Sequence, residues 1–266
     1  MKIFTEDNIL IKDRISFAGF ISPYSATVIE KIKAAGMEIV NNQNDADAVL
    51  STNAANNMFY IKPTYGTVSR FGLEANVSSM DQIGVCAGNL DTAFAVLSVI
   101  AGHDEKDPTT YPAKKYDYSH NCADLIITEL NNFKYADCLN EVYMIISSAE
   151  FSNNISRYDG LKYGYRTEKT DIVVNSRSEI FTLDAKLKAL MGAYVLSEGQ
   201  FEKYYLKATK LRRLIKQELD EIFKQADAIR VPDMTLAYLC GFPALIKPDG
   251  SCFITQNTRE GNFYGI

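Results

Sequence analysis

The sequence contains no tryptophan and only two histidines, His103 and His120, among its 266 residues. Neither histidine has a second ligand-type residue at a spacing typical of zinc sites, so we expect a structural or surface role for both. With so few histidines, a Ser-His-Asp triad is a poor candidate for the chemistry of this chain. The sequence therefore predicts neither a metal nor a cofactor.

Long apolar runs and closely spaced cysteines are also missing. No segment approaches the roughly 18 consecutive apolar residues of a membrane helix, and the first residues, MKIFTEDNILIKD, carry acids where a signal peptide has its apolar core. The five cysteines form no CxxC pair, and their odd number fits reduced thiols better than a disulfide framework. We therefore expect a cytoplasmic protein without a membrane partner.

The chain has enough apolar residues to form a large core. Hydrophobic residues make up 47% of the chain, which argues against disorder, and the length fits one large domain or two small ones. The formal net charge is −5, from 28 basic and 33 acidic residues. That balance argues against broad, charge-driven binding of nucleic acid.

The spacing of apolar residues predicts an α/β protein. Helices are predicted over residues 26–35, 90–101, 141–152 and 200–226. Strands are predicted over residues 8–11, 37–40 and 227–232. Ser25 is expected to cap the first helix, because its side-chain oxygen can accept from free amides of the first turn. We expect the tail 257–266 to be mobile.

The stretch 60–107 carries the most specific pattern in the chain. Residues 62–84 read KPTYGTVSRFGLEANVSSMDQIG, and residues 99–107 read VIAGHDEKD. Pro63 fixes its own φ and Gly66 permits backbone angles that other residues avoid, so a bend is expected there. Taken alone, these residues predict only a strand-turn-helix segment.

As an ordered set, these motifs closely resemble the amidase-signature family, and within it the A subunits of glutamyl-tRNA(Gln) and aspartyl-tRNA(Asn) amidotransferases. Residues 141–166, EVYMIISSAEFSNNISRYDGLKYGYR, extend the resemblance into the second half of the chain. The resemblance implies an α/β fold with a mixed β-sheet core covered by helices and internally truncated. It also implies one truncated domain over residues 1–266, made of an N-terminal part (1–107), a variable linker (108–140) and a C-terminal part (141–266).

Lys12 is the first candidate site residue. It follows an apolar run, within the sequence IKDRI. One interpretation is a solvated lysine at a strand end; the other is a lysine that projects into a site, where burial lowers its pKa and makes it a base. The resemblance places Lys12 on the lysine of the family's Ser–cis-Ser–Lys triad, although Arg14 replaces the usual asparagine.

The two catalytic serines of that triad have no counterpart here. In the family, a glycine- and serine-rich signature precedes KPTYG, whereas in this chain Phe59-Tyr60-Ile61 joins directly to Lys62. One internal deletion accounts for the difference. A second alignment places residues 51–56 on the family's SDTGGS segment and puts Asn56 at the nucleophile position. Ser51 and Thr52 are the nearest hydroxyls, but they lack the glycine frame that an oxyanion pocket requires.

Tyr158 is the second candidate site residue. It lies in the sequence RYDG, a region that lines part of the substrate cavity in the family. The alternative interpretation is a buried tyrosine beside an Arg157–Asp159 pair.

Two functions follow from the resemblance. The loss of both serines favours a pseudoenzyme, a non-catalytic relative with a role in binding or assembly. The alternative is an active A subunit that hydrolyses glutamine and supplies ammonia for the conversion of Glu-tRNA(Gln) to Gln-tRNA(Gln). The implied partners are the amidotransferase B and C subunits, glutamine if a pocket remains, and tRNA only indirectly.

Overall fold

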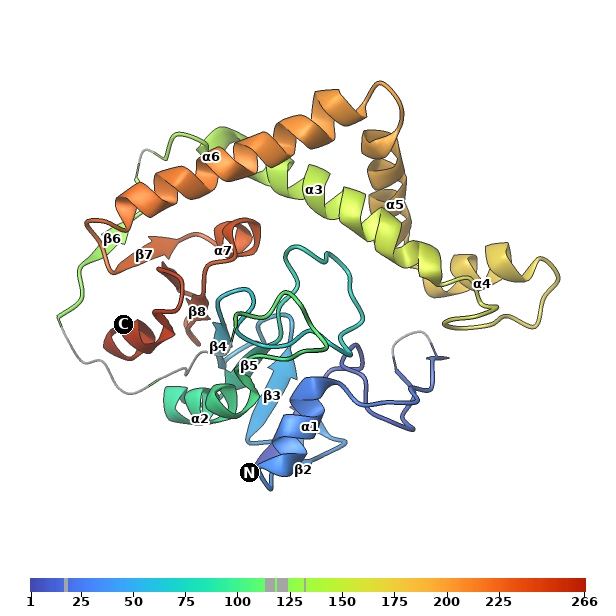
Figure 1. Cartoon of the computed structure of the whole chain (residues 1–266), viewed down its shortest axis with the longest axis horizontal. Helices are drawn as coiled ribbons and strands as arrows, with labels where there is room; N and C mark the ends of the chain where they lie inside the picture. The colour runs from blue at the N-terminus through green and yellow to red at the C-terminus, as the bar shows by residue number, and fades with distance from the viewer. Residues whose placement is uncertain (17–18, 113–117, 119–123, 132) are drawn as a thin grey trace.

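The computed structural model describes residues 1–16, 19–112, 118, 124–131 and 133–266. Within these residues, one nine-stranded mixed sheet runs through the molecule (Figure 1). Its strands are β1 (Lys2–Thr5), β2 (Glu38–Ile39), β3 (Ala48–Ser51), β4 (Phe59–Lys62), β5 (Gly84–Ala87), β6 (Ile127–Glu129), β7 (Ala228–Val231), β8 (Ala244–Ile246) and β9 (Cys252–Thr255). They lie in the order β2-β1-β3-β5-β4-β8-β9-β7-β6.

Helices cover both faces of this sheet. They are α1 (Thr27–Ala34), α2 (Leu90–Ile100), α3 (Leu139–Asn154), α4 (Ile172–Ile180), α5 (Leu183–Leu196), α6 (Leu206–Ile222) and α7 (Thr235–Cys240). In Figure 1, α1 and α2 lie on one side of the sheet, and the long helices α3 and α6 lie on the other, with α5 packed beside α3. A π-helical turn, Phe201–Tyr205, leads into α6.

The alternation of side chains along the central strands creates two cores. In β3, Val49 joins the apolar cluster beneath α3, α6 and α7, whereas Ala48 and Leu50 join the cluster beneath α1 and α2. Neighbouring strands repeat the pattern, because Tyr60 faces the first cluster and Ile61 the second. This is the period of two that a strand buried on both faces produces. The predicted α/β class and mixed sheet are confirmed.

All four predicted helices are present, as α1, α2, α3 and α6, and the strands predicted at 37–40 and 227–232 occur as β2 and β7. The strand predicted at 8–11 is wrong. Ile9 forms only an isolated bridge with Leu73, because its amide bonds to the carbonyl of Glu6 and turns the chain away from the sheet. The first strand is β1, earlier in the chain.

Two smaller predictions are also wrong. Ser25 does not cap α1; Ala26 is the N-cap residue, and the Ser25 Oγ atom instead accepts the Lys12 amide at 3.0 Å. The tail 257–266, which was predicted to be mobile, is ordered. It forms a 3-10 helix over Glu260–Gly265 in which Glu260 and Phe263 are buried. Phe263 fills the core beneath α2, and this burial holds the tail in place. The division at residues 107 and 140 stays a prediction.

Candidate functional site

The segment 52–58 stands where the sequence predicts the loss of the family's catalytic signature. It joins β3 to β4, and these parallel strands lie on either side of β5. The segment therefore crosses one face of β5, where the Cys86 thiol lies 3.6 Å from the Asn53 carbonyl oxygen. Ala55 and Met58 pack against the apolar cluster beneath α3 and α6. This short crossover closes the core without any serine or glycine.

The hydroxyl at the start of the crossover is tied to a carboxylate. The Ser51 Oγ atom lies 2.7 Å from Glu6 Oε1 and 2.7 Å from the Asn53 carbonyl oxygen. The second Glu6 oxygen accepts the Thr52 amide at 3.3 Å. Ser51 is only 2% exposed, so its oxygen is largely shielded from a ligand in solution. These bonds give Ser51 a clear structural role at the end of β3.

Lys12 lies at an exposed position in a loop that bonds back to residues 20–25, where the Asp13 amide donates to the Ser22 carbonyl at 2.8 Å. Its backbone amide donates to the Ser25 side chain. Its ammonium group forms no hydrogen bond or ion pair within the described residues. The structure thus does not bring the Lys12 ammonium group onto Ser51 or Thr52.

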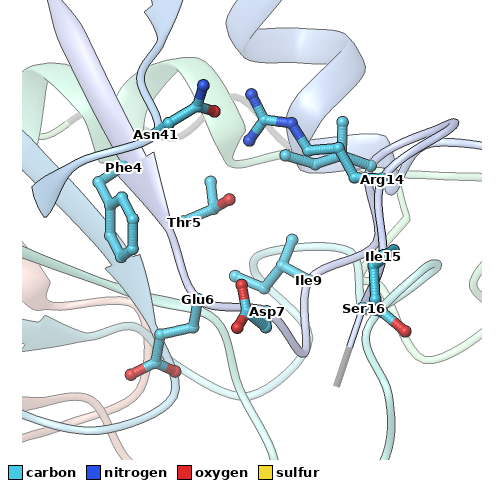
Figure 2. A pocket seen from close by; sticks show the side chains of 10 residues that line it. Phe4, Thr5, Glu6, Asp7, Ile9, Arg14, Ile15, Ser16 and Asn41 are labelled. Atoms are coloured by element: carbon cyan, nitrogen blue, oxygen red, sulfur yellow. The ribbon is translucent and has the colours of Figure 1, made fainter. Parts of the chain in front are cut away.

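A cavity of about 370 Å³ lies next to this loop (Figure 2). Ten residues line it, including Ile11 and Arg14 on either side of Lys12, but not Lys12 itself. Figure 2 shows Arg14 extending toward Asn41, with the Glu6 carboxylate on the opposite side. The cavity is therefore polar and carries both signs of charge.

A second cavity of about 370 Å³ holds Tyr158. It shares Glu6 and Asp7 with the first cavity, so these two residues separate the two spaces. Tyr158 is 7% exposed and packs edge-on against the ring of Tyr163, with ring centroids 5.2 Å apart, and against Phe181 at 6.0 Å. The structure therefore places Tyr158 in the wall of a cavity, but it does not bring Tyr158 to Lys12.

Burial, aided by the negative charge of Glu74, raises the pKa of the Tyr158 phenol to about 12. The phenol is consequently neutral at physiological pH. The Arg157–Asp159 pair is not formed. The Arg157 Nε atom donates to the Asn154 carbonyl at 2.8 Å, while Asp159 accepts the backbone amides of the turn that follows it.

Sequence reasoning missed several buried charged residues, among them Glu74 and Lys62. Glu74 is 6% exposed and lines the second cavity. Lys62 is fully buried at the end of β4, and its Nζ atom donates to the Phe242 carbonyl at 3.0 Å. Burial lowers the pKa of Lys62 to about 7, although Glu260 and Cys240 act in the opposite direction. One sequence signal could have identified Lys62 as buried, because this lysine directly follows the apolar residues of β4.

The described residues offer no group of three or more His, Cys, Asp or Glu side chains that could hold a metal ion. Asp47, which lies near Asp45 in the sequence, accepts the Lys2 amide at 2.7 Å. His103 bonds through Nδ1 to Thr110 and the Tyr111 carbonyl, both at 3.1 Å, and His120 lies outside the described residues. Among the described helices, none is both long and apolar enough to cross a membrane.

Comparison with known proteins gives a consistent relationship. The family model described as Amidase matches residues 54–134 and 122–241. The A subunit of glutamyl-tRNA(Gln) amidotransferase from Lachnoclostridium phytofermentans is 33% identical, over 86% of this chain and 66% of its own length. The protein of the same name from Sulfolobus acidocaldarius is 29% identical, over 91% of this chain and 78% of its own length.

Solved structures share the fold. The A subunit of glutamyl-tRNA(Gln) amidotransferase from Thermotoga maritima superposes with a TM-score of 0.68 and 20% identity, over 100% of this chain and 81% of that one. Peptide amidase of Stenotrophomonas maltophilia gives a TM-score of 0.77 at 18% identity, over 99% and 80% of the two chains. At these identities the similarity concerns the fold alone.

Proposed function

Because this chain belongs to the amidase family, we propose that it is a non-catalytic member related to the A subunits of tRNA-dependent amidotransferases. The single observation that carries this proposal is the crossover 52–58. Acyl transfer needs an activated hydroxyl and a set of amide donors for the oxyanion. The crossover contains no serine and no glycine, and it packs its apolar side chains into the core.

The environment of Lys12 and Ser51 supports the same conclusion. Lys12 is exposed, and its ammonium group has no partner within the described residues that would hold it beside a nucleophile. The buried hydroxyl at the start of the crossover, Ser51, is bonded to the Glu6 carboxylate rather than to an amine. In this proposal Lys12 is a remnant of the triad lysine, and Tyr158 is a retained wall of the former substrate cavity.

An internal deletion is consistent with the lengths of the aligned proteins. The alignment with the Sulfolobus acidocaldarius protein spans 372 positions, which exceeds the 266 residues of this chain. That relative therefore has many residues without a counterpart here. We place the most consequential loss between β3 and β4, and the protein in the cytoplasm with the amidotransferase B and C subunits as its partners.

The test is a glutaminase assay of the purified full chain, alone and with added B and C subunits. We expect no ammonia above the buffer control, together with co-purification of the B subunit. Ammonia release that disappears in Lys12→Ala, but not in the matched surface variant Lys33→Ala, would refute the non-catalytic assignment. A failure of both the B and the C subunits to bind would refute the assembly role.

A second candidate function, an active glutamine-hydrolysing A subunit, is favoured by one observation. Ser51 is hydrogen-bonded to Glu6, which lines both cavities, so a carboxylate could accept the proton of a recruited serine. This candidate predicts ammonia release that is lost in Ser51→Ala and in Glu6→Gln. Unchanged activity in both variants would exclude Ser51 as the nucleophile.

A further inference from the structure

Helix α5 is apolar on two opposite faces. Its inner face, with the buried Gly192 and Val195, packs against α3. Its outer face carries four large side chains that are 52–71% exposed, which we call the α5 stripe: Leu183, Leu187, Leu190 and Tyr194. A surface helix of a globular protein normally has polar residues on the face that points away from the core. The outer face of α5 therefore has the composition of a buried surface.

The α5 stripe is one continuous row along the helix. Its members follow one another at intervals of four, three and four positions, which is the heptad spacing of a helix seam. At 3.6 residues per turn, the four side chains fall within about 60° of one another around the helix axis, and Gly192 falls on the opposite side. The stripe thus points away from α3, and Figure 1 shows α5 at the outer edge of the molecule.

The area of the stripe is large enough for a specific contact between two proteins. A large apolar residue presents roughly 150–250 Å² when it is fully exposed, and more than half of each stripe residue is exposed. The stripe therefore offers about 400–500 Å² per copy, a size at which contiguous apolar patches mark interaction sites. A contact between two such stripes would bury about 1,000 Å² in total, which is the lower bound for a specific interface.

The charges of α5 do not favour a strongly charged partner. Asp184 and Lys186 border the stripe on opposite sides and balance each other, and the Lys186 Nζ atom donates to the Ser178 carbonyl at 2.8 Å. Lys188 lies on the inner side, 5.2 Å from the centroid of the Phe151 ring. An anionic membrane surface would require a row of basic residues beside the apolar face, and α5 has none. An uncharged apolar helix is the partner that fits this stripe.

The stripe is complementary to itself. When two α5 helices pack antiparallel about a two-fold axis, Leu187 lies opposite Leu190 of the second copy. Leu183 then lies opposite Tyr194 of the second copy, so each ring packs on a smaller side chain. The Tyr194 hydroxyl already donates to Gln200 Oε1 at 3.3 Å, and its ring can be covered without leaving this hydroxyl unpaired.

The residues that flank the stripe are compatible with the same arrangement. In an antiparallel pair of helices, Asp184 falls beside Met191 of the second copy, and Lys186 falls beside its Ala193. No like charges face each other across this contact, so electrostatic repulsion does not oppose it.

We propose that the chain forms a two-fold dimer in which the α5 stripe packs antiparallel on the same stripe of a second copy. This interface goes beyond the proposed function and does not depend on whether the chain hydrolyses glutamine. Because the buried area is at the lower bound for a specific interface, we expect a reversible dimer with a Kd of about 1–100 μM.

Sedimentation velocity of the purified full chain, from about 1 to about 200 μM, tests the dimer. The mean sedimentation coefficient should rise from the monomer value to the dimer value over this range. Leu187→Lys and Leu190→Glu should each weaken association at least about tenfold, because each places a charge against an apolar side chain of the second copy. Leu214→Glu, at an exposed leucine of α6, is the matched control and should leave association unchanged. A monomeric wild type at every concentration, or a dimer that both stripe variants leave intact, would overturn the proposal.

A mixture of the two stripe variants tests the antiparallel register. In the proposed dimer, the ammonium group introduced at position 187 of one copy faces the carboxylate introduced at position 190 of the other. An equimolar mixture of Leu187→Lys and Leu190→Glu, both folded by circular dichroism, should therefore associate at least about tenfold more tightly than either variant alone. In a parallel dimer each position would face itself, so a mixture without this gain would refute the antiparallel contact. A monomeric wild type whose binding to the B subunit is lost in Leu187→Lys would assign the stripe to that subunit and refute the dimer.

Discussion

Replacement of the buried Lys62 by methionine should stabilise the protein in weak acid and lose that advantage as the pH rises. Lys62 is fully buried at the end of β4, where its Nζ atom contacts the carbonyl oxygens of Phe242 at 3.0 Å and Pro63 at 3.4 Å. Methionine has a similar length and no charge. The variant therefore removes the buried ammonium group while keeping most of the packed volume.

The size of the effect follows from the pKa of Lys62. Burial lowers this pKa from 10.5 to about 7, so at pH 6, where Lys62 is mainly charged in both states, the buried charge lowers the unfolding free energy by about 5 kcal/mol. Removal of the Nζ atom leaves the Phe242 carbonyl without its donor, which costs about 1–3 kcal/mol. We therefore expect Lys62→Met to gain about 2–4 kcal/mol of unfolding free energy at pH 6.

The sign of the pH dependence is fixed by proton counting. Between pH 7 and 10.5 the unfolded chain holds a proton on Lys62 that the folded chain has released, so the unfolding free energy of the wild type rises with pH. The methionine variant lacks this contribution. Its advantage should shrink by about 3 kcal/mol between pH 6 and pH 9.

Urea unfolding of the wild type and Lys62→Met at pH 6, 7.5 and 9 measures this difference, because titrating groups that do not interact with Lys62 cancel between the two proteins. Lys33→Met, at an exposed position of α1, is the matched control and should follow the wild type at each pH. A Lys62→Met advantage that is constant or grows with pH would contradict the assignment of a buried lysine that is neutral above pH 7.

Three further substitutions test the packing of the fold. Gly192→Ala should destabilise the chain by several kcal/mol in urea unfolding. A Cβ atom at this position of α5 would lie 2.0 Å from the Ser148 carbonyl oxygen of α3. An unchanged unfolding midpoint would mean that the two helices separate easily. Phe263→Ala should cost about 3–5 kcal/mol, since the ring is fully buried, and a tail that is dispensable would show almost no loss. Arg212→Met should lower the melting temperature by several degrees. The guanidinium group donates to the Ser79 hydroxyl at 2.7 Å and to the Ser79 carbonyl at 3.0 Å, and both bonds would be lost. A melting temperature equal to that of the wild type would assign Arg212 to the solvated face of α6.

Local periodicity predicted the helices well, because their apolar residues recur at intervals that one face of a helix explains. Phe94, Leu97 and Ile100 of α2 are all buried. The central strands β3, β4 and β5 were harder, since each is buried on both faces and shows a short apolar run instead of alternation. Their order in the sheet depends on contacts between distant segments, which no local pattern contains.

The site was predictable only in part, because its polar contacts join residues far apart in the sequence. The sequence singled out Tyr158, which the structure places in a cavity wall, but it gave no sign that Glu74 would reach the same wall. The residues around Glu74 give no sequence signal that this side chain is buried. Its partners, Tyr163 and Ser16, lie far from it along the chain. Likewise, the buried Glu260 escaped notice, since Thr64 supplies its donors from the other half of the fold.

The crossover 52–58 also determines how tolerant this sheet is to changes in length. Its two ends leave strands that pair with opposite edges of β5, so the pairing registers of β3 and β4 are set by β5 and not by the connection. A longer segment between Ser51 and Phe59 would alter the closing entropy only slowly with its length and would leave the strand order unchanged. This junction is therefore a position at which the chain can lengthen without a change in any strand pairing.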